Sequence, residues 1–226
     1  MSTKTIYDAL VAAGMTREGA SSVVGNWLAE SGCEAYRLEG DFSPSRGKSH
    51  AYVSDVMSGV ISRQQFSQDR KGYGLAQWTY PTRKAALYDF LQARGVPLDD
   101  EASQVQFALQ EMRTSLEYAS VWAVVTSSHD LFQCTQIVCK DYEKPAVNNV
   151  GTRHEYAQQF LDELANGSVT PTPVQQPEPG QSGDRWIGLL QFIMSVDGYW
   201  GAAVDGIKSQ EFRDAIKRYA ADVAAS

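Results

Sequence analysis

The eight residues GNWLAESG at positions 25–32 decide the fold of this chain. Apolar residues recur at helical spacing before and within them, which predicts a helix from about Thr16 to Ser31. Thr16 is a suitable N-cap, and Gly32 can adopt the left-handed conformation that closes a helix. Glu30 therefore falls in the last turn of the predicted helix.

That position predicts a specific chemistry for Glu30. The exposed carbonyl groups at the end of a helix carry partial negative charge, which opposes the ionisation of a carboxylate beside them. Burial beside Trp27 would act in the same direction, so the sequence predicts a raised pKa for Glu30. A carboxyl group that stays protonated near neutral pH can donate a proton to a glycosidic oxygen. The alternative is a glutamate on a solvated helix face.

A second segment, GYGLAQW at positions 72–78, has the composition of a sugar-binding turn. Its glycines let the backbone approach a ligand closely. Tyr73, Gln77 and Trp78 offer the apolar faces and hydrogen-bonding groups that a sugar ring requires. Each segment alone is weak evidence, but the pair predicts a site that cleaves a glycan.

Four blocks in this order resemble the phage tail-type lysozymes, over about Ile6 to Leu164. The blocks are GNxxxESG at 25–32, GYGLxQWT at 72–79, Arg83-Lys84 and YEKP at 142–145. That family shares the lysozyme-like fold with goose-type lysozymes and lytic transglycosylases. The resemblance implies a mainly α domain of the α+β lysozyme type, with Glu30 as the general acid and Tyr73, Gln77 and Trp78 lining the cleft.

A second catalytic carboxylate is predicted at Asp69, because many glycosidases use a pair of carboxyl groups. Asp69 precedes the glycine-rich segment at a spacing that is similar to the family's, although Gly72 stands where animal-type lysozymes have the acid. Glu39, Asp41 and Asp55 are competing candidates. A solvated loop charge beside Arg70 and Lys71 is an equal alternative for Asp69, and lytic transglycosylases work with one glutamate alone.

Composition excludes several classes of function. The chain has 226 residues, 43% of them hydrophobic, with a net charge of −7 and a pI near 5.0. Clustered Lys and Arg are absent, which argues against nucleic-acid binding. We expect no membrane insertion, and the first residues lack the apolar core of a secretory signal. The sequence thus predicts synthesis in a bacterial host cytoplasm and action at the cell wall after release or from the virion.

Three cysteines, Cys33, Cys134 and Cys139, are predicted to keep free thiols, because a reducing compartment disfavours disulfides. No metal or other cofactor is expected, since the spacing of Cys134 and Cys139 does not place both on one helix face. A cysteine-based amidase would need a Cys–His pair that the sequence does not reveal.

The remainder of the domain, residues 1–165, is predicted to be helical with one irregular stretch. Residues 34–71 are expected to be mostly loop, with a short helix near 52–58 and any β-structure of the domain. Further helices are expected to begin at Pro81, near Asp100, after Asp130 and at Thr152. Tyr142, at the end of the third of these, either hydrogen-bonds the substrate or Glu30, or is a buried tyrosine that holds this corner.

Beyond this domain, a proline-rich linker is predicted over 166–183 and a small helical module over 184–226. The module is similar in part to small peptidoglycan-binding modules, which implies wall binding through Asp197, Tyr199 and Trp200. The alternative is a helical hairpin that packs on the catalytic domain or forms an oligomer. For the protein as a whole we infer no oligomeric state from the sequence.

The sequence as a whole predicts a phage-type endolysin that cleaves the β-1,4 bond between N-acetylmuramic acid and N-acetylglucosamine in bacterial peptidoglycan. A lytic transglycosylase with the same glutamate is the first alternative. A wall-binding or virion structural protein without turnover is the second, and an amidase or peptidase is the third.

Overall fold

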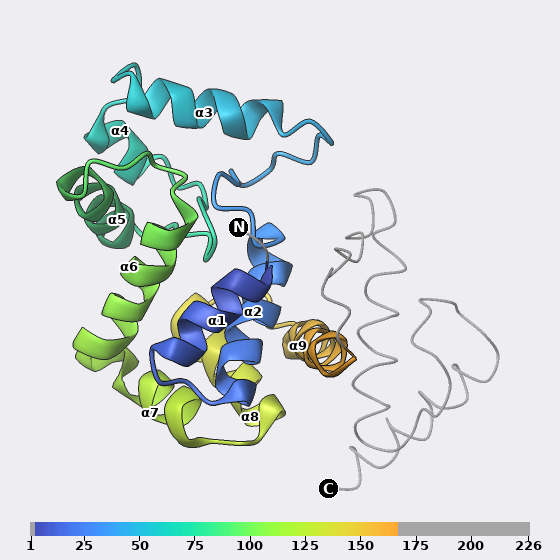
Figure 1. The fold of residues 1–226 in the computed structure, drawn as a ribbon. Coiled ribbons are helices and arrows are strands. Elements are labelled where there is room, and N and C mark those ends of the chain that lie inside the picture. Colours follow the sequence, from blue (N-terminus) through green and yellow to red (C-terminus); the bar gives the residue numbers. More distant parts are fainter. Residues whose placement is uncertain (1–2, 167–226) are drawn as a thin grey trace, which may run out of the picture. The chain divides into compact units, whose positions relative to one another are not determined.

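The computed structural model describes residues 3–166, and this part of the chain is mainly helical (Figure 1). It contains nine α-helices, one 3-10 turn and one π-helical turn. The elements are α1 (Thr3–Ala12), α2 (Arg17–Ser31), α3 (Gly47–Met57), α4 (Arg63–Gln68), α5 (Pro81–Ala93), α6 (Glu101–Thr114), η1 (Leu116–Tyr118), α7 (Ala119–Ser127), α8 (Leu131–Ile137), η2 (Val138–Glu143) and α9 (Val150–Ala165). No helix in the described range is long and apolar enough to cross a membrane.

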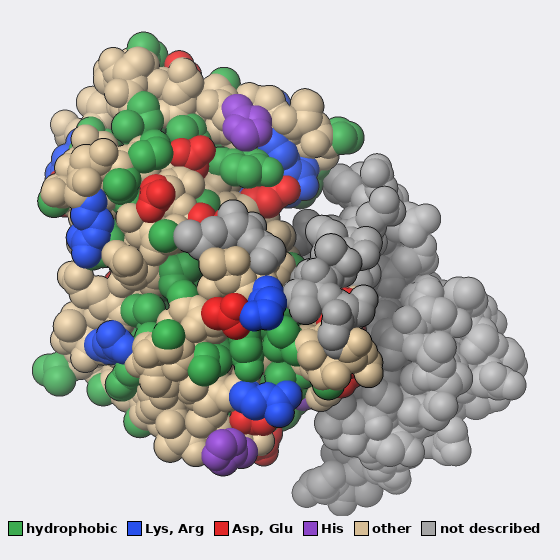
Figure 2. Space-filling model, in the orientation of Figure 1, with side chains coloured by type: hydrophobic (Ala, Val, Ile, Leu, Met, Phe, Trp, Pro, Cys, Tyr) green, Lys and Arg blue, Asp and Glu red, His purple; other side chains and the backbone are tan. Residues whose placement is uncertain are grey.

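The helices form two groups that α6 connects (Figure 1). In one group α4 packs on α5, with α3 close by in the figure. In the other, α2 packs on α1, α7, α8 and α9. Helix α6 contacts α5 from the first group and α1 and α7 from the second. On the face shown in Figure 2, acidic and basic side chains of the described residues are interspersed and form no continuous basic patch.

Helix α2 is the central element, and its predicted boundaries are confirmed. The Thr16 side chain accepts a hydrogen bond from the Gly19 N–H, and Gly32 closes the helix with φ of 68°. Gly25 allows close packing against α9, because a Cβ atom there would lie 2.5 Å from the Arg153 carbonyl oxygen. The glycine at position 25 therefore lets α2 lie in close contact with α9.

The prediction for residues 34–71 is partly wrong. Most of the stretch lies outside helices, as expected, but α3 begins five residues before the predicted position 52, and α4 was not predicted. A capping box between Ser62 and Gln65 starts α4, and this Ser-x-x-Gln pattern is visible in the sequence. Any β-structure of the domain was expected in this stretch. Among the described residues there are only isolated bridges, which pair Tyr73 with Leu38 and with Trp78.

Most of the predicted helix starts are confirmed. Pro81 is the first residue of α5, and the side chains of Asp100 and Asp130 cap α6 and α8. Helix α9 begins at Val150, two residues before the expected position. The chain leaves helical geometry before Pro145 as expected, since Lys144 has φ of 51°.

All three cysteines have free thiols, as predicted. The predicted linker beyond Asn166 and the predicted module at 184–226 lie outside the described residues, and so do Asp197, Tyr199 and Trp200.

Candidate functional site

Glu30 occupies the last turn of α2 and has an arginine as its partner. Its Oε1 accepts a hydrogen bond of 2.6 Å from Nη2 of Arg153, and the Glu30 side chain is 18% exposed. Arg153 itself is buried and fixed, because Nε donates to Asn149 Oδ1 at 2.7 Å and Nη1 to Asn26 Oδ1 at 3.1 Å. Glu30 is therefore a partly buried carboxylate held in one orientation.

Arg153 was not identified from the sequence, although a signal for it exists. It lies on the buried face of α9, at helical spacing from Ala157 and Phe160. Charged residues are almost never fully buried unless they are paired. An arginine in an otherwise apolar stripe thus indicates a buried partner, but its sequence position does not tell which acid that partner is.

A second carboxyl group, Glu143, lies in the same cluster. Its Oε1 accepts a hydrogen bond of 3.0 Å from the indole N–H of Trp27, which precedes Glu30 by one turn of α2. Burial raises the pKa of Glu143 well above its usual range, and the charge of Glu30 raises it further. Arg83, Arg153 and the Trp27 hydrogen bond act in the opposite direction. Two carboxyl groups from distant parts of the chain therefore interact electrostatically here.

Glu143 is the last residue of η2, a π-helical turn. Such turns widen a helix locally and are frequent at functional sites. In the sequence, Glu143 is distinguished only as part of the YEKP block at 142–145. Its relation to Glu30 depends on tertiary packing across more than a hundred residues, and no local pattern could have revealed it.

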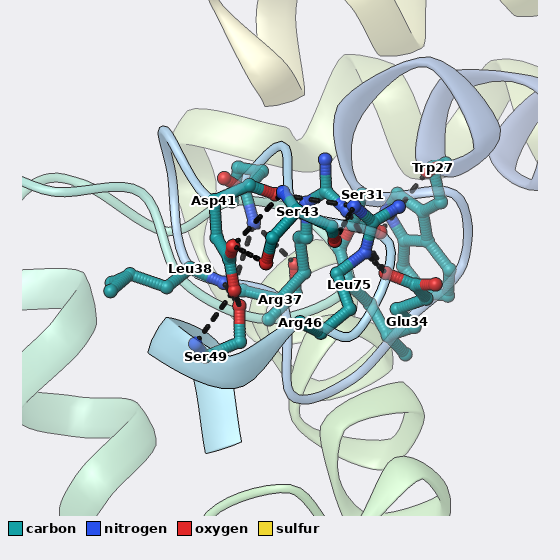
Figure 3. A network of polar contacts seen from close by, with 12 residues as sticks. Trp27, Ser31, Glu34, Arg37, Leu38, Asp41, Ser43, Arg46, Ser49 and Leu75 are labelled. Atoms are coloured by element: carbon teal, nitrogen blue, oxygen red, sulfur yellow. Dashed lines mark hydrogen bonds and ion pairs between the residues drawn. The ribbon is translucent and has the colours of Figure 1, made fainter. Parts of the chain in front are cut away.

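The two motif segments that predicted the site adjoin one another. Ser31 Oγ, next to Glu30, donates a hydrogen bond of 2.8 Å to the Leu75 carbonyl in the glycine-rich segment (Figure 3). Gln104 of α6 reinforces this junction, because Oε1 accepts from the Leu75 N–H at 2.9 Å and Nε2 donates to the Ala35 carbonyl at 2.8 Å. The glycine-rich segment is thus attached to the end of α2 that carries Glu30.

The residues predicted to contact sugar lie mostly inside the core. Tyr73, Trp78 and Tyr142 are buried. Gln77 is half-buried, and its Nε2 donates to the carbonyl groups of Arg37 and Gly74 at 3.1 and 2.9 Å. In this structure these side chains support the site from within, and their predicted contacts with sugar stay predictions.

A buried network around Glu111 explains the positions of Trp78 and Tyr142. Glu111 Oε2 accepts hydrogen bonds from Trp78 Nε1 at 2.9 Å and from the Tyr142 hydroxyl at 2.8 Å. Arg83 binds both oxygens of Glu111 at 2.8 Å, and its guanidinium lies 4.6 Å from the centre of the Tyr142 ring. This network fixes η2 against α5 and α6, and so positions Glu143.

Asp69, the predicted second carboxylate, has a different set of partners. Its Oδ1 accepts from Lys84 Nζ at 2.5 Å and from the Lys71 N–H at 3.0 Å, while Oδ2 accepts from the Tyr52 hydroxyl. Lys84 is fully buried, and its ammonium group lies 4.4 Å from the centre of the Phe66 ring. These contacts give Asp69 a structural role, and its catalytic role stays a prediction.

The competing carboxylates also have structural contacts. Asp41 is buried, and although burial opposes its ionisation, hydrogen bonds from Ser43 and Ser49 lower its pKa below the usual range (Figure 3). Glu39 is exposed and accepts from the Gly72 N–H at 2.7 Å. Among residues 3–166 no group of three or more His, Cys, Asp or Glu side chains is arranged to hold a metal ion.

Comparison with protein families identifies the family to which the chain belongs. A family model described as phage tail lysozyme matches residues 2–164, which is more than two thirds of the chain. No curated protein matches the chain.

Proposed function

The chain belongs to the phage tail lysozyme family, and from this premise we propose that it is a peptidoglycan hydrolase that uses Glu30 as its general acid. Family membership implies lysozyme-like glycosidase chemistry on peptidoglycan. We place the cleavage at the β-1,4 bond between N-acetylmuramic acid and N-acetylglucosamine.

The observation that carries the proposal is the environment of Glu30. Its carboxyl is partly buried, fixed by Arg153 and attached through Ser31 to the glycine-rich segment. A general acid must be held in place beside the bond that breaks, because misplacement of a reacting group by about 1 Å can cost about 100-fold in rate. Among the candidate acids, Glu30 combines this fixation with a direct neighbour, Ser31, that is hydrogen-bonded to the second motif segment.

In the proposed reaction, Glu30 gives a proton to the oxygen that links the two sugars. The bond from that oxygen to the anomeric carbon breaks, and positive charge develops on the sugar ring. The carboxylate left on Glu30 stabilises this charge. Water then adds to the anomeric carbon and gives a proton back to Glu30. Asp69 is not needed in this scheme, since its contacts with Lys84 and Tyr52 account for its position.

Two alternatives use the same site. In a lytic transglycosylase the 6-hydroxyl of the muramic acid would replace water and form an anhydro ring. In a protein without turnover the fold would serve only to bind the wall. The presence of a second carboxyl group, Glu143, beside the fixed Glu30 favours an active site over a protein without turnover.

Analysis of the products of purified peptidoglycan by mass spectrometry tests the proposal. We expect the wild type to release fragments that end in reducing N-acetylmuramic acid, and Glu30→Gln to release them at least about 100-fold more slowly. Anhydro ends would indicate the transglycosylase. Equal release by the two proteins, or none from several wall types, would contradict the proposal.

We also propose that the protein acts at the bacterial wall, released at lysis or carried in the virion, and that the segment at 184–226 binds the wall. Tethering of this kind would raise the local concentration of the enzyme at its substrate. Deletion of 184–226 is expected to weaken sedimentation with purified walls while the cleavage of soluble glycan fragments continues.

A further inference from the structure

The charged groups around Glu30 do not balance. Three acids interact here, namely Glu30, Glu111 and Glu143, with the two arginines Arg83 and Arg153. Arg83 is bound by both oxygens of Glu111, and Arg153 is bound by Glu30. Glu143 has no arginine or lysine in hydrogen-bond contact among the described residues. The cluster is therefore neutral only when one proton is added to it.

The geometry places Glu143 where it can hold that proton. Oε1 accepts from the Trp27 indole, while Oε2 is buried and has no hydrogen-bond partner among residues 3–166. Leaving a buried carboxylate oxygen without a donor is costly, whereas a protonated carboxyl avoids a buried charge. Trp27 belongs to the same helix as Glu30, three residues before it, so one side chain of α2 holds Glu143 beside the proposed acid.

We propose that Glu143 and Glu30 share one proton, which Glu143 holds between turnovers and passes to Glu30 when a glycan binds. This inference rests on the proposed function of Glu30. Glu143 acts through Glu30 and does not itself touch the substrate. The substrate is the same peptidoglycan as in the proposed function, and the inference adds the source of the proton that Glu30 donates.

The proton transfers balance over one turnover. First the O–H bond of Glu143 breaks and one forms on Glu30. Because Glu143 Oε2 has no hydrogen-bond partner among residues 3–166, the proton crosses through a solvent water, which takes a proton from Glu143 and gives one to Glu30. Next the O–H bond of Glu30 breaks as the proton moves to the glycosidic oxygen, which leaves with the bond electrons. Water then adds to the anomeric carbon and gives its proton to Glu30, which returns it to Glu143. The cluster ends with the same protons and charge as it began.

Groups from each neighbouring element act on Glu143. Helix α2 contributes Glu30, which favours the protonated form of Glu143. Arg83 of α5 and Arg153 of α9 favour the charged form, although each is bound to another acid. On η2 itself, Cys139 and Tyr142 are buried neutral groups whose own pKa values are raised by burial.

The pH dependence of activity in Glu143→Gln tests the inference. The amide keeps the size of the side chain and an oxygen for the Trp27 hydrogen bond, but it cannot hold the proton. The alkaline limb of the pH–rate profile should therefore move by at least about one pH unit to lower pH, and the loss of activity on that limb should be about tenfold greater than the loss at acidic pH. Asp141→Asn is the control, since Asp141 is an exposed acid on the same turn, and its profile should match the wild type.

A second variant should move the profile in the opposite direction. Trp27→Phe removes the N–H that favours the charged form of Glu143, so the pair should keep its proton to higher pH. An unshifted alkaline limb in Glu143→Gln, or an equal loss of its activity at all pH values, would overturn the shared proton. A shift of the alkaline limb to lower pH in Trp27→Phe would overturn the shared proton as well.

A titration independent of turnover separates the two proposals. In protein labelled with ¹³C-glutamate, the side-chain carboxyl signal of Glu143 is assigned by its absence in Glu143→Gln. We expect Glu143 to titrate at lower pH in Glu30→Gln than in the wild type, because the neighbouring charge is removed. No change would overturn the sharing. If the wild type cleaves glycan but the titration of Glu143 is the same in Glu30→Gln as in the wild type, only this inference fails. If the wild type cleaves no glycan, the proposed function fails.

Discussion

Two ion pairs in this molecule look nearly identical but have different surroundings. In the pair of Glu30 with Arg153, the carboxylate side chain is 18% exposed, the cation is 4% exposed and the atoms are 2.6 Å apart. In the pair of Asp69 with Lys84, the corresponding values are 18%, 0% and 2.5 Å. Burial and distance alone therefore do not tell which pair belongs to the active site.

The difference lies in the third group of each cluster. Beside Asp69 the third group is the neutral Tyr52 hydroxyl, and the Lys71 backbone donates as well, so one negative charge meets one positive charge. Beside Glu30 the third group is another acid, Glu143. A balanced pair with all of its hydrogen bonds made stabilises a fold. A pair with a surplus carboxyl instead stores a proton, which a general acid requires.

Breaking the balanced pair should give the largest loss of stability. In Asp69→Asn the buried Lys84 loses its counter-charge, and we expect the free energy of unfolding to fall by about 3 kcal/mol. Denaturant unfolding measures this loss. Adding Lys84→Met to Asp69→Asn should restore most of it, because no buried charge is then left unpaired, and the lack of any recovery would contradict the assignment of a pair.

Moving α9 should disturb the other pair. A Cβ atom in Gly25→Ala would lie 2.5 Å from the Arg153 carbonyl oxygen, so α9 must shift away from α2. We expect a loss of about 1–3 kcal/mol in stability and a lower rate of glycan cleavage in the folded protein. Gly47→Ala is the control, since its Cβ would meet only Ser45 Oγ at 3.6 Å, and it should change neither quantity. If folded Gly25→Ala cleaves glycan at the wild-type rate, a fixed position of Arg153 is not required for activity.

The surplus carboxyl should leave a pH signature in stability. The pKa of Glu143 is raised in the folded protein, so its contribution to stability is present at low pH and is lost as pH rises through the folded-state pKa. Glu143→Gln removes this dependence. Relative to the wild type it should gain stability as pH rises above the usual glutamate range, by at most about 1.4 kcal/mol per pH unit. A constant difference between pH 4 and pH 8, checked by unfolding at each pH, would argue against a buried proton.

The smallest effects are expected at two matched helix caps. Thr16 caps the helix that carries Glu30, and Ser62 caps the helix that precedes Asp69. Thr16→Ala and Ser62→Ala should each lower the unfolding free energy by about 1 kcal/mol. Neither should change the rate of glycan cleavage at temperatures where the protein stays folded, since neither cap contacts the acid pair. A selective loss of activity in Thr16→Ala would show that the start of α2 also positions Glu30.

Local patterns predicted the elements that depend on local chemistry. Thr16, Asp100 and Asp130 were identified as helix starts because a capping side chain acts within its own turn. The capping box at Ser62 is an equally local signal, but the many serines and glycines around it are typical of loops and mask it.

The composition of the site depends on contacts that local patterns do not encode. Glu30 was predicted because its position at a helix end and its sequence block are local features. Arg153, which binds Glu30, is 123 residues away along the chain, and Glu143, which interacts with Glu30 electrostatically, is more than a hundred residues away. Asp69 was selected by its spacing from the glycine-rich segment, and that spacing could not show that Lys84 lies beneath it.

The most direct test compares the two acids in one assay. Rates of release of reducing sugar ends from purified peptidoglycan should be measured for Glu30→Gln and Asp69→Asn, each corrected for its folded fraction. We predict at least about a 100-fold loss for Glu30→Gln and a rate close to wild type for Asp69→Asn. A near-normal rate for Glu30→Gln, or an equal loss in both variants, would contradict the account.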